Sequence, residues 1–177
     1  MVSIAPEAVV GTTIALSYIL LGNAITQSFM GVPALLVDFP APSSPDHAAR
    51  ARLLGRQWPV FWQVGNVFFR PISTFGIFGY GYTAYCAGSS SSYRLGDWKM
   101  YALAATCHLV TVLHSAANMQ PINEKLDALK EPKGSQPGVE VAKAESYARK
   151  WISYNTVRLI MPMVAGSVAL WQTIISL

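Results

Sequence analysis

Long windows without charge are the feature that most limits what this chain can fold into. Four windows, spread over 177 residues, contain no Asp, Glu, Lys or Arg and many apolar side chains: Gly11–Val37, Pro71–Tyr93, Met100–Asn123 and Leu159–Leu177. About 20 such residues let an α-helix cross a hydrocarbon core. The sequence therefore predicts an all-α integral membrane protein, with a single domain 1–177 that forms a four-transmembrane-helix bundle. The expected spans are about 10–31, 64–87, 100–120 and 155–176.

The charged residues indicate a membrane partner and an orientation. They make up 12% of the chain, against roughly 25% in soluble domains. Most basic residues fall in two segments, at 50–56 and 125–150, and the loop between the second and third spans has only Arg94 and Lys99. The positive-inside rule places loops one and three in the cytoplasm. Anionic headgroups of the lipid bilayer suffice as partner for the net charge of +4, and we find no nucleic-acid motif.

The segments that flank the spans suggest how the chain approaches the bilayer. Pro45 and Asp46, before an Ala/Arg/Leu run, are typical of a helix cap and a short interfacial helix. Trp58 and Trp62 suit the headgroup level, and His47 is expected in a solvated loop. The polar segment 139–150 predicts a cytoplasmic extension that runs straight into the last helix. The first span is expected to be retained rather than cleaved as a signal peptide, because it lacks a basic region before it.

Polar residues lie on one helix face at the start of the last apolar segment, which continues to Leu177. Trp151, Asn155 and Arg158 follow a spacing that places them on one side of a helix. A charge inside a membrane span is costly and usually faces the protein interior, where it marks a functional site. The alternative is that Arg158, and likewise Arg70 in the second span, extends to the headgroups.

Polar residues of all four expected helices fall at similar depth. With 1.5 Å of rise per residue, they share a layer in the cytoplasmic half of the bundle, which predicts an internal polar cavity. The residues are Asn23 and Gln27 in the first helix, Asn66 and Arg70 in the second, His114 and Asn118 in the third, and Asn155 and Arg158 in the fourth.

The histidines carry the candidate acid–base chemistry. His114 and Asn118 are four residues apart and share a helix face, so they either form interhelical hydrogen bonds or include a general base. His108 lies on a different face and is expected to pack or to form a hydrogen bond. Because His108 and His114 do not share a face and Glu124 lies outside the span, no metal site is predicted.

Two motifs resemble a known family. The run Trp151-x3-Asn155-x2-Arg158-x3-Pro162-x3-Gly166 resembles the last helix of the fungal anthrone oxygenases and their bacterial relatives. The run Asn118-Met-Gln-Pro-Ile-Asn123 resembles that family's exit from the third helix, and Ser28-x4-Pro33 in the first helix also fits. The layout of four helices covers essentially the whole chain.

This resemblance implies an enzyme of polyketide secondary metabolism. The expected activity is oxidation of an anthrone-type polyketide to an anthraquinone by a monooxygenase that uses molecular oxygen and no metal or flavin cofactor. The resemblance carries Asn118, Trp151, Asn155 and Arg158. Our hypothesis is that Asn118, Asn155 and Arg158 are oxyanion donors and that Trp151 stacks on the substrate. His114 as general base is inferred from its position, and Asn23, Gln27, Asn66 and Arg70 complete the expected substrate-binding set.

Two interpretations of the sequence remain open. The first is this membrane-bound oxygenase. The second is a non-catalytic bundle that binds lipid or partner proteins and whose polar layer is structural. In a eukaryote the resemblance implies the endoplasmic reticulum. The sequence names neither the polyketide nor an oligomeric state.

Overall fold

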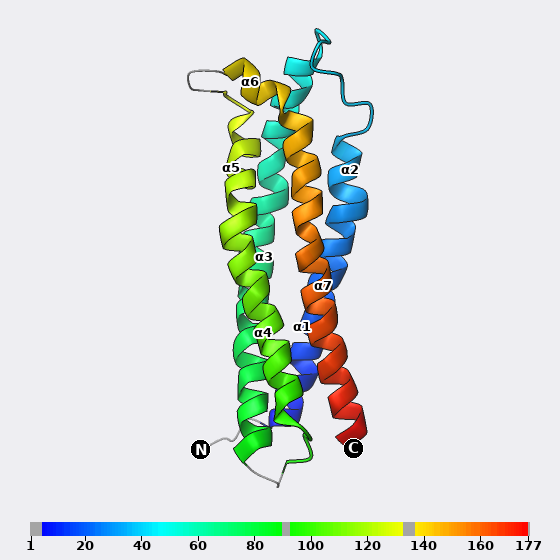
Figure 1. The fold of residues 1–177 in the computed structure, drawn as a ribbon, viewed down its shortest axis with the longest axis vertical. Coiled ribbons are helices and arrows are strands. Elements are labelled where there is room, and N and C mark those ends of the chain that lie inside the picture. Colours follow the sequence, from blue (N-terminus) through cyan, green and yellow to red (C-terminus); the bar gives the residue numbers. More distant parts are fainter. Residues whose placement is uncertain (1–4, 90–92, 133–136, 177) are drawn as a thin grey trace. The chain divides into compact units, whose positions relative to one another are not determined.

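Helices form all the regular structure in the part of the chain that the structure describes. The computed structural model describes residues 5–89, 93–132 and 137–176, and these contain no strand. This confirms the all-α prediction. Figure 1 shows the elements in order, in which η marks a π-helical turn: α1 (Pro6–Thr26), η1 (Gln27–Gly31), α2 (Val32–Leu35), α3 (His47–Ser89), α4 (Trp98–His114), η2 (Ser115–Met119), α5 (Gln120–Ala128), α6 (Pro137–Ala142) and α7 (Ala144–Ser176).

Three continuous helical runs among the described residues are long and apolar enough to cross a membrane: Pro6–Leu35, Trp98–Ala128 and Ala144–Ser176. They correspond to the first, third and fourth expected spans, so the chain is a membrane protein. The expected span at 64–87 lies inside α3, which has 43 residues but is not one of the three. Its Gly, Ser and Tyr residues make it less apolar. A fourth span remains a prediction.

The helices continue through prolines where the sequence suggested ends. The sequence predicts that the first and third spans end near residues 31 and 120, just before Pro33 and Pro121. Instead, η1 ends two residues before Pro33 and η2 ends two residues before Pro121, and a further helical segment follows each. A proline has no N–H for the carbonyl four residues earlier. A single wider π turn changes the hydrogen-bond register there, and the helix goes on beyond the proline.

Two further boundaries differ from the expectation. The segment from His47 and the residues of the expected second span form one helix, α3, rather than an interfacial helix and a separate span. The segment 139–150 is divided, because α6 ends at Ala142 and α7 starts at Ala144. The amide of Lys143 bonds the carbonyl of Glu140 at 3.2 Å, which closes α6 with a tight turn.

The chain forms two compact units. Unit 1 comprises Met1–Asn23, Phe69–Leu113 and Val157–Leu177, and unit 2 comprises Ala24–Phe68 and His114–Thr156. The long helices α1, α3 and α7 contribute residues to both units. Whether these units form one domain, as the sequence predicts for 1–177, stays a prediction.

Unit 1 has a core in which small residues allow helices to approach closely. Tyr80, Tyr101 and Leu95 are buried among alanines of α4 and α7, and the Tyr101 hydroxyl donates to the Leu95 carbonyl at 2.8 Å. A methyl group added at Gly166 of α7 would lie 3.2 Å from the Tyr18 ring. Because apolar driving force between helices is weak in lipid, such close packing is a main source of helix association.

Unit 2 has a core built around two tryptophans. Trp58 of α3 and Trp151 of α7 pack with Leu54 and Leu126 and with Ala148, which lies one turn before Trp151. Trp58 has no exposed surface, so it does not contact headgroups, and its depth in the membrane stays a prediction. Its ring points into unit 2, where it contacts other core side chains such as Leu54 and Trp151.

Candidate functional site

One amide in unit 2 joins the two core tryptophans. The Oδ1 atom of Asn123 accepts the indole N–H of Trp151 at 2.8 Å and that of Trp58 at 3.3 Å. The two indoles meet edge to face, with centroids 5.5 Å apart and planes at 87°. Since an indole N–H buried without an acceptor is costly, Asn123 fixes both rings. This cluster positions the first turns of α7 against α3 and α5.

Asn155 stands one turn beyond Trp151 on α7 and is fully buried. Its Nδ2 donates to the Ala24 carbonyl at 3.1 Å and to the Ser28 hydroxyl at 2.8 Å. Its Oδ1 is buried and has no hydrogen-bond partner among the described residues. The structure therefore confirms that Asn155 faces inward, and it leaves an acceptor available inside unit 2.

Two more side chains of unit 2 keep a buried polar atom without a partner in the described part of the chain. They are Gln27, through Oε1, and Trp62, through Nε1. A methyl group at Gly65 would lie 4.0 Å from the Nε2 of Gln27, so this side chain lies against α3, three residues from Trp62. Unit 2 thus holds two unused acceptors and one unused donor.

His114 forms a hydrogen bond at each of its ring nitrogens. Its Nε2 lies 2.9 Å from the Tyr154 carbonyl, and a carbonyl only accepts, so Nε2 carries the hydrogen. Its Nδ1 accepts from Nδ2 of Asn118 at 3.1 Å. The predicted shared face of His114 and Asn118 is confirmed by this bond, and the contact with Tyr154 is an interhelical hydrogen bond of the expected kind. The nitrogen lone pair that could accept a proton is therefore on Nδ1, where Asn118 now donates its hydrogen bond.

Both π turns in the described residues belong to unit 2 and carry predicted site residues. Gln27 begins η1, and Asn118 lies in η2 directly after His114. Such turns are rare and occur frequently at functional sites. Each π turn also precedes a proline. The proline is the cause of the irregular backbone, and it lies close in sequence to the polar residue in that turn.

The other predicted site residues are distributed as follows. Asn66 of unit 2 is partly buried, while Asn23, Arg70 and Arg158 belong to unit 1. Arg70 is exposed and Arg158 is partly buried. Within the described residues no carboxylate forms an ion pair with Arg158. The roles proposed for these residues from the sequence remain predictions.

His108 takes a structural position in unit 1. Its Nε2 lies 3.0 Å from the Ser17 hydroxyl, which also bonds Tyr80 at 2.9 Å. Its Nδ1 faces α3, where a methyl group at Gly76 would overlap the ring. The prediction of a packed, hydrogen-bonded histidine is confirmed. The close approach of Gly76 leaves no space for a substrate atom at Nδ1.

The comparison with protein families decides the identity. A family model described as anthrone oxygenase matches residues 58–168. The chain belongs to the anthrone oxygenase family. This confirms the resemblance and supports an oxygenase role in general terms. No curated protein and no solved structure gives a match.

The region matched to the anthrone oxygenase family begins at Trp58 and therefore includes Asn123 and Trp151 as well as Asn155 and Arg158. The first-helix pattern that starts at Ser28 lies outside the match. The residues that sequence reasoning missed are Asn123, as the joint acceptor, and the inward direction of Trp58. The signal for Asn123 was present, because the residue closes the motif Asn118-Met-Gln-Pro-Ile-Asn123.

Two other features of this anthrone oxygenase family member add no site residue. A largely apolar groove of about 460 Å³ in unit 1 is lined by small residues and by Tyr85 and Trp98, with none of the predicted site residues. Among the described residues, no three His, Cys, Asp or Glu side chains come together in a way that could hold a metal ion. Cofactor independence stays a prediction.

Proposed function

We propose that this chain is a membrane-bound oxygenase that converts an anthrone-type aromatic polyketide to an anthraquinone with molecular oxygen. Family membership supports an oxygenase, and the unused polar atoms of unit 2 support the substrate class. Asn155 and Gln27 offer acceptors, and Trp62 offers a donor. A hydroxylated anthrone carries phenolic donors and a carbonyl acceptor, so it complements this set.

The energetic argument is that unsatisfied polar groups are costly inside a protein. Each buried donor or acceptor left without a partner costs about 1–3 kcal/mol. A ligand that supplies the missing partners recovers this free energy on binding, whereas an apolar ligand of the same shape does not. Asn155 and Gln27 are therefore proposed to select for hydroxyl groups on the ring system.

The proposed reaction begins with proton removal from the anthrone methylene, whose anion is stabilised as an aromatic phenolate. His114 takes the proton at Nδ1 after Asn118 turns aside. The carbanion then gives its electrons to O2 and forms a carbon–oxygen bond. Protonation yields a hydroperoxide, and loss of water leaves the second quinone carbonyl. One O2 is consumed and one water is released per substrate, which balances the step without a further reductant.

Hydrogen-bond donors stabilise the charge that develops on the substrate oxygen. The amide of Asn118 has two N–H groups, and these can contact the oxyanion once Asn118 has turned away from His114. Arg158 is a cation in a candidate span with no acidic partner among the described residues. We propose it as a further stabilising charge, as the family motif suggests.

The topology belongs to the same proposal. The basic segments around Arg52 and Lys150 face the cytoplasm and both termini lie on the other side. The first turns of α7, with α6 before them, lie in the cytoplasm. Four crossings, with α3 as the second, are needed for this arrangement. In a eukaryotic cell the membrane is that of the endoplasmic reticulum.

The selection for hydroxyl groups can be tested with one variant and two substrates. Gln27→Leu removes the acceptor and keeps the volume. We expect its KM for a hydroxylated anthrone to rise roughly tenfold, while its KM for the corresponding O-methylated anthrone stays close to that of the unmodified protein. Equal KM changes for both substrates would contradict the role of Gln27 and leave the oxygenase activity standing.

A further inference from the structure

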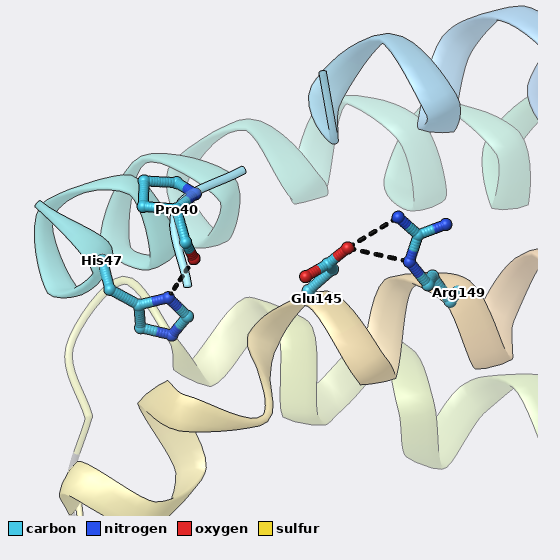
Figure 2. Close-up of polar contacts among 4 residues, drawn as sticks. All are labelled: Pro40, His47, Glu145 and Arg149. Atoms are coloured by element: carbon cyan, nitrogen blue, oxygen red, sulfur yellow. Dashed lines mark hydrogen bonds and ion pairs between the residues drawn. The ribbon is translucent and has the colours of Figure 1, made fainter. Parts of the chain in front are cut away.

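His47 is held between two backbone carbonyls in unit 2. Its Nδ1 lies 2.7 Å from the carbonyl oxygen of Pro40, and its Nε2 lies 2.9 Å from that of Val141. Figure 2 shows the ring at the start of α3, with the bond to Pro40 drawn as a dashed line. The side chain is only 4% exposed, so the prediction of a solvated loop histidine is wrong.

The chemistry of these two contacts fixes the protonation state that satisfies both. A carbonyl oxygen accepts hydrogen bonds and cannot donate, so each ring nitrogen must carry a hydrogen. A neutral imidazole has one N–H, and only the imidazolium has two. The protonated ring therefore makes both bonds, and the neutral ring makes one and leaves the other carbonyl facing a lone pair.

The charged side chains on the elements that meet at His47, or directly follow them in the chain, form other contacts or are exposed. They are Asp38 and Asp46 in the preceding loop, Arg50 on α3, Glu140 and Lys143 at α6, and Glu145 and Arg149 on α7. Glu140 accepts from the Tyr147 hydroxyl at 2.6 Å. Arg149 donates to Glu145 at 2.6 and 2.8 Å, one turn apart on α7 (Figure 2).

The remaining neighbours of His47 do not neutralise its charge. Arg50 points to the carbonyls of Leu35 and Val37, each at 3.4 Å. Phe39 meets the imidazole edge to face, with centroids 5.6 Å apart. Among the described residues no carboxylate forms an ion pair with His47. A protonated ring at this position has the dipoles of two backbone carbonyls beside it, one of them in the last turn of α6.

We propose that His47 is a protonation-dependent clamp that fastens α6 and the Pro40 loop to the start of α3. Protonated His47 ties all three elements together. As pH rises and the ring loses its proton, one of the two ties is lost, and α6 or the Pro40 loop loosens. The clamp is complete at acidic pH and weakened at alkaline pH, because the second N–H exists only in the charged ring.

The consequence reaches the core of unit 2 through the chain. α6 is followed after one residue by α7, whose Ala144 and Ala148 pack in the same core as Trp58. A loosened α6 therefore frees the first turn of α7. The amides that report this are Lys143, bonded to Glu140, and Tyr147, bonded to Lys143. The amide of Ser44, bonded to Ala41, reports the loop.

Amide hydrogen exchange of the full chain in detergent tests the clamp. Exchange is measured at about pH 5.5 and about pH 8.5, on either side of the range in which histidine changes its charge, and is corrected for the intrinsic pH dependence of exchange. We expect corrected exchange at Lys143 or Ser44 to be roughly tenfold faster at the higher pH. In His47→Gln, which stays neutral, this pH response disappears. His114→Gln, the control, keeps it.

A second measurement does not depend on any variant. Nitrogen NMR of the unmodified protein with labelled histidine distinguishes a ring with two N–H groups from a ring with one. We expect His47 to carry two at the lower pH. A ring with one N–H at that pH, or the same pH response in His47→Gln as in the unmodified protein, would overturn the clamp.

Discussion

The side-chain oxygen of Asn123 lies 2.8 Å from the indole nitrogen of Trp151, and it also receives the indole N–H of Trp58 at 3.3 Å. Three separate segments of the chain, α3, α5 and α7, are joined at this one atom. Packing alone would leave the two indole rings free to tilt, and the directional hydrogen bonds to Asn123 fix their orientation. The turn of α7 that precedes Asn155 is therefore held in place by directional hydrogen bonds as well as by packing.

Removing this acceptor should destabilise the protein. Asn123→Leu leaves two buried N–H groups without partners, and we expect the free energy of unfolding in mixed micelles to fall by about 2 kcal/mol or more. Asn123→Asp keeps an oxygen in place and should lose less. Gln120→Leu, which removes an exposed bond to Glu124, serves as control. Equal unfolding free energies for Asn123→Leu and Gln120→Leu would show that the two indole bonds contribute nothing.

A pair of glycine substitutions tests the close packing of unit 2. A methyl group at Gly55 would lie 2.7 Å from the backbone carbon of Leu129, and at Gly11 it would meet nothing within 4 Å. We expect Gly55→Ala to destabilise by about 1–3 kcal/mol because backbone must move. Gly11→Ala should stabilise by about 0.5–1 kcal/mol, since alanine favours the helix. Chemical unfolding in detergent measures both, and a stabilised Gly55→Ala would be incompatible with the packing described.

His114 should be needed for turnover through its Nδ1 lone pair. His114→Gln keeps a donor for the Tyr154 carbonyl but loses the base, so kcat should fall about 100-fold or more while product binding is retained. The assay is quinone absorbance with a hydroxylated anthrone, with product binding followed by tryptophan fluorescence. Full turnover in His114→Ala would rule out this residue as the base.

Arg158 should affect turnover more than an ordinary surface arginine. We expect Arg158→Ala to lower kcat by about 100-fold or more, because a charge that stabilises the developing oxyanion is lost. Arg158→Lys should recover part of the rate. Arg94→Ala, which changes an exposed loop residue, is the matched control in the same quinone assay. Similar rates for Arg158→Ala and Arg94→Ala would favour the alternative in which Arg158 only reaches the headgroups.

Features with a local cause could be predicted from the sequence. The apolar windows indicated three of the observed candidate spans, because hydropathy over about 20 residues is set by the segment itself. The helix face that carries Trp151 and Asn155 was also read correctly, since helical spacing alone determines it. The shared face of His114 and Asn118 follows the same rule.

Features that depend on distant segments could not be predicted. The burial of Trp58 against Asn123 has no local signal, because the two residues are 65 positions apart. His47 was assigned to solvent because one of its two carbonyl partners, Val141, is 94 residues away. The helix ends expected at Pro33 and Pro121 were wrong for another reason. A proline removes one N–H, but a π turn before it restores a continuous helix, and spacing rules for regular helices contain no such turn.

The most direct test of the oxygenase account is a mixing experiment. Purified, chelator-treated protein is combined anaerobically with emodin anthrone, oxygen is admitted, and quinone absorbance is followed beside the Arg158→Ala variant. The account predicts acceleration over the spontaneous rate that survives chelation and falls in the variant. Acceleration lost on chelation would contradict the metal-free chemistry. No acceleration with emodin anthrone or with other hydroxylated anthrones would contradict the oxygenase activity and favour a non-catalytic membrane bundle.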